Sequence, residues 1–181
     1  MYLAHTRPDH AYSLCVVSQF MHNPEEKHMN TIMFILKYLK SAPANGILFT
    51  KCVDPLVTNV YTDVDWAENI DDRRSTSKYF TFVGGNLVTW RSKSQNVVAR
   101  SSAEAKFRGM TLEICEALCL RLLLTDLGYP PKAPIQLYCD NKAAHDIAHN
   151  PVQHNCTKHV EGDRFFIKEK LDGKILESPK I

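Results

Sequence analysis

Three acidic side chains each stand at the boundary of a predicted core element. Asp63 closes a β-branched and aromatic run, Glu104 lies in the first turn of a long helical pattern, and Asp140 closes a second apolar run. If these elements are neighbours, the three carboxylates converge at one edge of a sheet. Converging carboxylates repel one another unless cations neutralise them, and hard oxygen ligands suit Mg²⁺ or Mn²⁺. Two such ions can clamp the attacking and leaving oxygens of a phosphoryl group, so the predicted chemistry is phosphodiester hydrolysis.

Each acid also has a purely structural interpretation. Glu104 follows Ser101 by three residues, as in a capping box, and Asp140 can cap a following helix. Asp63 and Asp65 can form a turn. The joint arrangement favours a metal site over independent caps, and both interpretations stay open.

Histidine and cysteine residues near the C-terminus raise zinc as an alternative. His145 and His149 are spaced i, i+4, and His154, Cys156 and His159 follow them. No CxxC pair and no HExxH motif accompanies them, so zinc is the less favoured interpretation. A histidine near bound metal ions can assist product departure, and His159 is the candidate for that role.

The elements that must position the acids follow from hydrophobic periodicity. Alternating runs from residue 57, over 78–83 and over 87–91, with a Gly-Gly-Asn turn at 84–86, predict three consecutive antiparallel strands. A helix is predicted from the capping box at Ser101 to about Leu127. A strand over 135–139, helices over 141–149 and 157–171, and a strand over 174–177 complete the order βββ-α-β-α-α-β. This order predicts an α/β fold with a mixed sheet.

Residues 1–50 read as a separate helical segment. An apolar stripe predicts one helix over 8–22, and Asn23 as cap with Pro24 at the first helical position predicts a second helix ending near Ser41. The side chains expected to be buried on the second helix are Met29, Ile32, Ile35, Leu36 and Leu39. The segment has no paired acids, phosphate loop or metal spacing, so it is predicted to be a packing unit.

Composition sets outer limits. The 181 residues are 44% hydrophobic and 23% charged, enough for one ordinary core and a smaller appendage. The net charge is only +2, so nucleic-acid binding must come from a local basic face. The six scattered cysteines, with no secretory leader and no transmembrane run, indicate reduced thiols in an intracellular, cytoplasmic protein.

Six ordered motifs resemble the ribonuclease H domain of copia-type retrotransposon Pol polyproteins, in particular plant ones. They are Tyr61–Ala67, Asp72–Ser77, Gly84–Gly85 with Trp90–Lys93, Ser101–Ala105, Leu137–Asn141 and Thr157–Glu161. Residues 1–50 resemble the C-terminal end of the reverse transcriptase that precedes this domain, through His5–Asp9, Ser18–Met21 and Leu36–Ser41. The resemblance therefore implies two parts, a helical reverse-transcriptase remnant over 1–50 and a ribonuclease H-like domain over 51–181.

The resemblance implies a ribonuclease H-like mixed sheet, Mg²⁺ dependence with Mn²⁺ as an alternative, and hydrolysis of the RNA strand of RNA–DNA hybrids. Asp63, Glu104 and Asp140 match the first three catalytic, metal-binding acids. Upstream reverse-transcriptase segments of the same polyprotein are the implied protein partners. The last acid of the family lies on a helix after the fifth strand, where this chain ends, so a C-terminally truncated domain is expected.

Fallback metal ligands are Asp65 on the first strand and Glu161 and Asp163 on the last predicted helix. Substrate contacts are expected from basic residues around the hairpin and the entry to the long helix, which neutralise phosphates without reading sequence. A solvated polar rim is the alternative for these residues. They are Arg73, Arg74, Arg91, Lys93 and Arg100.

Three residues depart from the motif pattern. Lys78 and Glu68 stand where the family usually has glycine, and Lys106 stands where an acid usually follows Ser-Ala-Glu-Ala. Since Lys106 is two residues from Glu104, it is expected to point off the face of Glu104, so it need not abolish metal binding. The departures also support a second hypothesis: a catalytically inactive, truncated retroelement remnant that folds and at most binds nucleic acid or a polyprotein partner.

Overall fold

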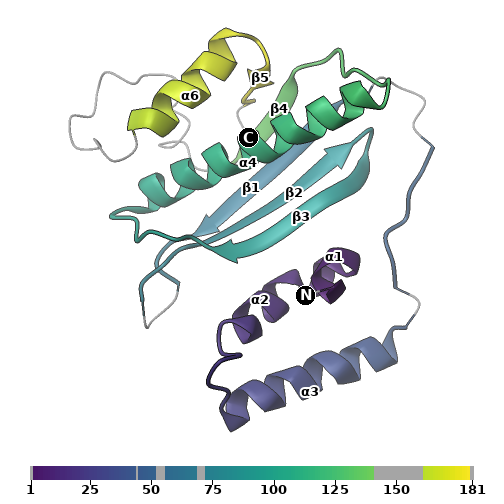
Figure 1. Ribbon diagram of the computed structural model, residues 1–181, viewed down its shortest axis with the longest axis vertical. Coiled ribbons are helices and arrows are strands. Elements are labelled where there is room, and N and C mark those ends of the chain that lie inside the picture. Colours follow the sequence, from purple (N-terminus) through teal and green to yellow (C-terminus); the bar gives the residue numbers. More distant parts are fainter. Residues whose placement is uncertain (1, 44, 52–55, 69–71, 141–160, 180–181) are drawn as a thin grey trace.

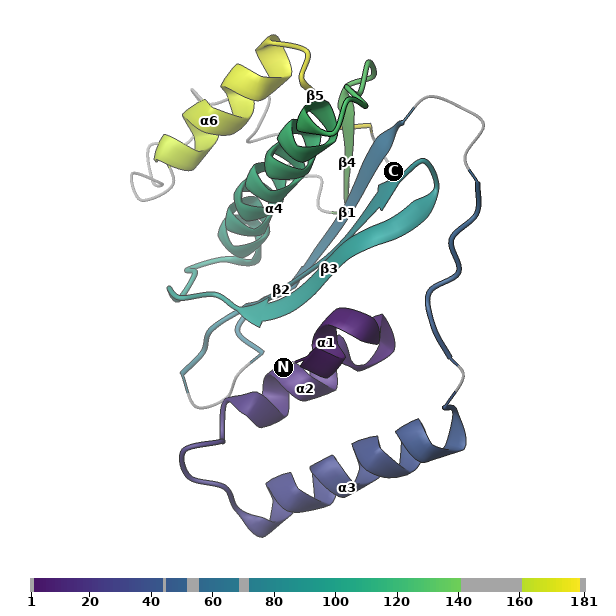
Figure 2. The ribbon, with the colours of Figure 1, turned by 45° about the vertical axis from the view of Figure 1, so that its right-hand side comes forward.

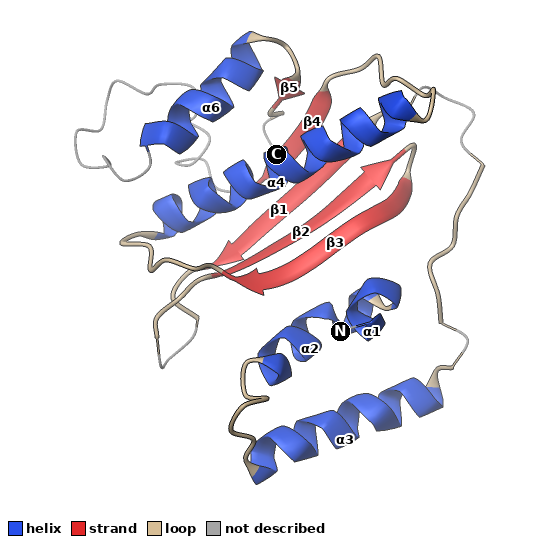
Figure 3. Cartoon of the chain, in the orientation of Figure 1, coloured by secondary structure: helices blue, strands red, loops and turns tan. Residues whose placement is uncertain are grey.

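A computed structural model describes residues 2–43, 45–51, 56–68, 72–140 and 161–179. The chain begins with helices and continues into a five-stranded sheet covered by a long helix (Figures 1 and 3). The N-terminal elements are α1 (Tyr2–Thr6), a 3-10 helix η1 (Pro8–His10), α2 (Ala11–Ser18) and α3 (Glu26–Ser41). No helix in these ranges combines the length and the apolar character that crossing a membrane requires.

The sheet has the strand order β3-β2-β1-β4-β5. Its strands are β1 (Thr58–Asp65), β2 (Thr76–Val83), β3 (Asn86–Ser94), β4 (Ile135–Cys139) and β5 (Leu176–Glu177). The first three are antiparallel neighbours, whereas β1 with β4 and β4 with β5 are parallel. The predicted α/β fold with three consecutive antiparallel strands is therefore confirmed.

The β2–β3 hairpin closes through a two-residue loop. Val83 pairs with Asn86, and between them Gly84 and Gly85 have φ values of 55° and 80°. Positive φ at both central positions is what a type I′ turn requires, and glycine adopts it without steric cost. The Gly-Gly-Asn signal thus fixes where the hairpin turns.

Helix α4 (Ser102–Asp126) crosses one face of the sheet, and α6 (Glu161–Asp172) packs beside it (Figure 1). A Cβ added at Gly109 would lie only 2.6 Å from Cγ2 of Val64, so the missing side chain lets α4 approach β1 closely. The buried apolar cluster fills the space between α4, α6 and the sheet. Its members are Val60, Phe107, Met110, Ile114, Ala117, Ile135, Leu137, Ile167 and Leu176.

The N-terminal helices lie on the opposite face of the sheet, beneath β2 and β3 (Figure 2). Ser77 faces α4 near Gly109, so the alternation of a strand turns Lys78 to the other side. On that side the indole Nε1 of Trp90 donates to the carbonyl oxygen of Ala4 at 2.7 Å. Trp90 is accordingly a half-buried packing residue.

The predicted start of α3 is wrong. The helix is capped by Glu25 and not by Asn23, because Glu25 and His28 form a reciprocal capping box in which Nδ1 of His28 accepts from the Glu25 amide at 3.0 Å. The His28 ring stacks on Phe20 with 4.0 Å between centroids. The cap therefore stands two residues after Asn23, and the helix begins at Glu26.

The predicted burial on α3 is wrong at two positions. Ile35 is buried, but Met29 and Leu36 are mostly exposed. The short α2 is the element that packs on α3, so it covers only a narrow strip of the helix. The predicted helix over 141–149 lies outside the described residues, and α6 and β5 confirm the last helix and strand.

Candidate functional site

Asp63 and Asp140 lie at the same edge of the sheet. Strands β1 and β4 are parallel neighbours whose last paired residues are Thr62 and Cys139. Each aspartate is the next residue along its strand, so both carboxylates stand at the carboxyl end of the parallel pair. Their side chains are 54% and 63% exposed. The sequence prediction that strands one and four bring these two acids together is confirmed at the level of topology.

The side chain that joins the two aspartates is Lys106 from α4. Its Nζ lies 3.5 Å from Oδ1 of Asp63 and also donates to Oδ1 of Asp140. The Lys106 side chain is only 12% exposed. Burial acts to lower the pKa of Lys106, but the Asp140 and Asp63 carboxylates outweigh it and the net shift is upward. The edge therefore carries a fixed cation between two carboxylates.

Glu104 does not lie with the two aspartates. Its amide donates to the hydroxyl of the N-cap residue Ser101 at 3.1 Å, and its carboxylate accepts from the amide of Arg100, the residue before the cap, at 2.9 Å. The same carboxylate pairs with Arg108 at 3.0 Å, and the Glu104 side chain is only 9% exposed. The structure thus shows Glu104 as a cap and an ion-pair partner on α4.

The separation of Glu104 from Lys106 follows from helix geometry. Residues two apart are about 200° apart around a helix, so the two side chains leave α4 in different directions. The expectation that Lys106 points off the face of Glu104 agrees with this. The Lys106 ammonium nevertheless contacts both aspartates at the acidic edge. The α4 position that meets Asp63 and Asp140 is 106.

The structure describes the side-chain surroundings of two of the remaining metal-ligand candidates, Asp65 and Asp163. Asp65 is paired with Lys78. Asp163 on α6 is half-buried, and burial raises its pKa while the charge of Arg108 opposes that rise. Glu161 is the first residue of α6, and His159 lies outside the described residues.

A divalent cation does not fit the contacts of the Asp63–Asp140 edge. Within the described ranges, no three His, Cys, Asp or Glu side chains form a group that could hold a metal ion. The third group at the edge is an ammonium, which has no lone pair to donate and repels a cation. The predicted convergence of three carboxylates is therefore reduced to two carboxylates and a lysine.

A buried acid that the sequence analysis missed lies further along α4. Glu113 is 1% exposed, and neither of its carboxyl oxygens has a hydrogen-bond partner among the described residues. Burial raises its pKa well above the ordinary value, and Asp63 adds to this, while the Thr62 hydroxyl opposes it without reaching hydrogen-bond geometry. Burial therefore favours the protonated form of Glu113 inside the domain. Its local sequence, between Leu112 and Ile114, gives no signal of this burial.

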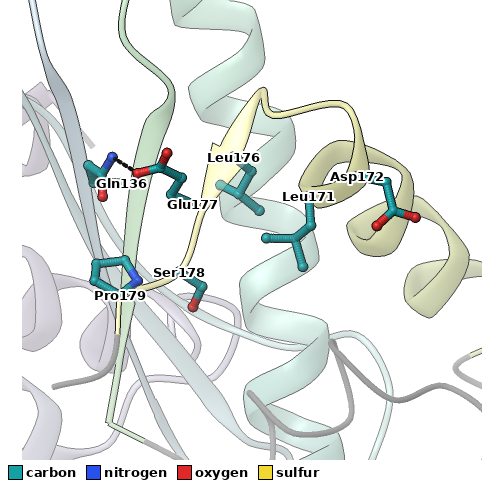
Figure 4. A pocket seen from close by; sticks show the side chains of 7 residues that line it. All are labelled: Gln136, Leu171, Asp172, Leu176, Glu177, Ser178 and Pro179. Atoms are coloured by element: carbon teal, nitrogen blue, oxygen red, sulfur yellow. Dashed lines mark hydrogen bonds between the residues drawn. The ribbon is translucent and has the colours of Figure 1, made fainter.

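A surface hollow of about 440 Å³ lies at the opposite end of β4 (Figure 4). It borders the short β5, and Gln136 Nε2 donates to Oε2 of Glu177 at 2.7 Å across it. Gln136 is near the start of β4, whereas Asp140 follows its end, so the hollow and the acidic edge are separate. The other lining residues are Leu171, Asp172, Leu176, Ser178 and Pro179.

Known proteins resemble this chain in sequence and in fold. No protein-family model matches it. The retrovirus-related Pol polyprotein from transposon RE1 of Arabidopsis thaliana is 40% identical over 175 residues, which is 97% of this chain and 12% of that protein. The Pol polyprotein from transposon TNT 1-94 of Nicotiana tabacum is 37% identical over 177 residues, or 97% of the chain and 13% of that protein. This chain belongs to the retrovirus-related Pol polyproteins of transposons.

The fold identifies which part of a Pol polyprotein the chain represents. LC11-RNase H1, isolated from compost, superposes with a TM-score of 0.50 at 12% identity, over 69% of this chain and 84% of that chain. The chain is therefore a ribonuclease H-like segment of Pol, and it spans about an eighth of the length of its curated relatives.

The basic residues predicted to contact substrate lie at the acidic end of this Pol segment. Asp65 at the end of β1 pairs with Thr76 at the start of β2, which pairs with Ser94 at the end of β3. The loop before β2, the end of β3 and the start of α4 therefore share one end of the sheet. The exposed basic residues there are Arg73, Arg74, Arg91, Lys93 and Arg100.

Proposed function

We propose that this Pol segment is a ribonuclease H-like domain that binds nucleic acid but does not hydrolyse it. The observation that carries the proposal is the contact of Lys106 with both Asp63 and Asp140. In the two-metal route, the carboxylates would bind the ions that activate the attacking oxygen and stabilise the leaving oxygen. In this protein the ammonium of Lys106 already pairs with both carboxylates, so it competes with any cation for them.

The charge balance at the edge explains why an ion is disfavoured. Two carboxylates and one ammonium sum to −1, whereas three carboxylates would sum to −3. A divalent cation would have to displace Lys106 from Asp140 and then stand beside the released ammonium. The divalent cation and the ammonium would repel each other at close range. This repulsion costs most free energy where a group is shielded from water, and the Lys106 side chain is only 12% exposed.

Nucleic-acid binding is supported by the basic residues at the same end of the sheet. Arg91 and Lys93 alternate with half-buried residues on β3, so their side chains leave the same face of that strand. Arg100 precedes the cap of α4 and Arg73 lies in the loop before β2. Arginine and lysine contact phosphates whatever the base sequence, which suits a duplex recognised by shape, and an RNA–DNA hybrid is the proposed ligand.

Hydrolysis is the second candidate, favoured by the adjacency of Asp63 and Asp140 at one strand end. It requires Mg²⁺ or Mn²⁺ held by Asp63, Glu104 and Asp140. Glu104 would then have to leave its cap and Arg108, and Lys106 would have to leave the edge. The first candidate requires none of these rearrangements.

A cleavage assay distinguishes the two candidates. The purified chain is incubated with an end-labelled RNA–DNA hybrid in Mg²⁺ or Mn²⁺, and binding of the same hybrid is measured by fluorescence anisotropy over a range of salt concentrations. We expect binding that weakens with salt and no cleavage. Cleavage that Asp63→Asn abolishes would establish the second candidate. The double variant Arg91→Ala/Lys93→Ala should weaken binding and reduce its salt dependence.

A further inference from the structure

The N-terminal helices touch the sheet through polar contacts as well as through packing. Trp90 Nε1 donates to the Ala4 carbonyl of α1 at 2.7 Å. Next to this contact, α2 packs on β3. These contacts join the helical segment to the sheet. They lie on the face of the sheet opposite α4 (Figure 2).

A second group of contacts surrounds Tyr12 of α2. Its hydroxyl donates to Oε1 of Glu68, just beyond β1. Nζ of Lys78 on β2 lies 4.8 Å from the centre of the Tyr12 ring, in the geometry of a cation–π contact, and pairs with Asp65. We call these four residues, Tyr12, Glu68, Lys78 and Asp65, the latch.

The latch lies at the end of β1, close to Asp63 of the acidic edge. Lys78 is the direct ladder partner of Asp63, yet its ammonium pairs with Asp65, two residues further along β1. The hydrogen bond to Glu68, together with burial, raises the pKa of Tyr12 to about 12. One aromatic side chain of α2 thus meets an acid after β1 and a cation of β2.

We infer that α1, α2 and the sheet unfold as one cooperative unit, and that the latch couples the N-terminal helices to the end of β1. This inference stands independently of whether the domain hydrolyses RNA. Hydrogen bonds to charged groups and cation–π contacts are strong enough to couple two packed elements when they share one residue. The 1–50 segment and the ribonuclease H-like segment are then not separable packing units.

The two tryptophans of the chain provide the first test. Trp90 reports on the contact with α1, whereas Trp66 donates to the Ala99 carbonyl at 3.1 Å and reports on the junction of β1 with the start of α4. Trp66→Phe and Trp90→Phe variants therefore each keep one local fluorescent probe. Each variant is unfolded in urea and followed both by the fluorescence of its remaining tryptophan and by far-ultraviolet circular dichroism. We expect the two signals of each variant to have the same midpoint. A Trp90 signal that changes at lower urea than the far-ultraviolet signal of the same variant would overturn the inference.

A double-mutant cycle tests the latch itself. Tyr12→Phe should increase the unfolding equilibrium constant by about threefold to tenfold, because it removes the hydroxyl from an acid and keeps the ring. In the Glu68→Ala background the same change should have less than about a twofold effect. Tyr129→Phe is the matched control, since Tyr129 is 65% exposed in a loop. The proposed coupling through the latch would be refuted if Tyr12→Phe had equal effects in both backgrounds. It would also be refuted if the effect of Tyr12→Phe were no larger than that of Tyr129→Phe.

Discussion

The ammonium of Lys106 lies 3.5 Å from the carboxylate of Asp63, on an element 43 residues further along the chain. Because the same ammonium also contacts Asp140, one side chain of α4 determines the charge of the whole edge. Replacing it should therefore change what the edge binds.

Lys106→Glu should create a cation site. The substitution brings a third carboxylate to Asp63 and Asp140, and clustered carboxylates favour a divalent ion. We expect isothermal titration calorimetry to detect Mn²⁺ binding to the variant at least about tenfold tighter than to the unsubstituted chain. Lys132→Glu, which makes the same charge change at an exposed position, is the matched control. Equal Mn²⁺ affinity for all three proteins would contradict the assigned role of Lys106.

Glu104→Ala should lower stability without affecting cation binding. The carboxylate caps α4 and pairs with Arg108, so its loss should cost about 1–2 kcal/mol of unfolding free energy in urea. Ser101→Ala removes the other half of the cap and should have a comparable effect. In the Lys106→Glu background, Mn²⁺ affinity should be the same with Glu104 or alanine. A large loss of affinity would instead make Glu104 a ligand, as the motif resemblance implies.

Glu113 should make stability depend on pH. Its folded-state pKa is raised, so the folded protein holds a proton that the unfolded chain releases above about pH 4.5. Its contribution to stability is therefore fully present below that pH and is lost as pH rises through the folded pKa. Glu113→Gln should raise the unfolding free energy at pH 8 by about 1–3 kcal/mol and change it little at pH 4. A constant difference across pH would show that Glu113 does not titrate in this way.

Gly109→Ala should destabilise the domain by about 1–3 kcal/mol. The added Cβ would lie 2.6 Å from Cγ2 of Val64, so α4 or β1 must move. Gly162→Ala on α6 is the matched control, because nothing lies within 4 Å of its added Cβ. There, the higher helix propensity of alanine should stabilise by up to about 1 kcal/mol. Thermal unfolding of both variants measures the contrast, and equal shifts would mean that Gly109 is not a packing constraint.

The strands and α4 could be predicted because their signals are local. Alternation over β1, β2 and β3, the Gly-Gly turn and the N-cap at Ser101 depend on neighbouring residues, and the structure agrees with each. The adjacency of β1 and β4 was a condition of the predicted acid cluster, and the structure meets it with a parallel pairing. These features account for the placement of Asp63 and Asp140.

The identity of the third residue at the edge could not be read from the motif. Which side chain of α4 meets the aspartates depends on the rotation of the helix about its axis, which packing of Gly109 against Val64 sets. The local pattern places Glu104 and Lys106 in the first turns of α4. It does not say which of the two side chains points toward the aspartates. The start of α3 was also missed, because the reciprocal cap of Glu25 and His28 begins the helix at Glu26.

The residues that depart from the family pattern also form a set in space. Lys78 and Glu68 both contact Tyr12, and Lys106 contacts the two aspartates. In the sequence these three residues are separate departures from the family motifs. Their partners show that each new charge is balanced by an opposite charge or by a polar group.

Lys106 has an evolutionary consequence. Codons for glutamate and lysine differ by one base, so the step between a carboxylate and an ammonium at this position is a single point mutation. The step changes the formal charge of the edge from −3 to −1, because the Lys106 ammonium offsets one of the two carboxylate charges of Asp63 and Asp140. A single base change at this codon would therefore decide whether the strand end holds two carboxylates with an ammonium or three carboxylates.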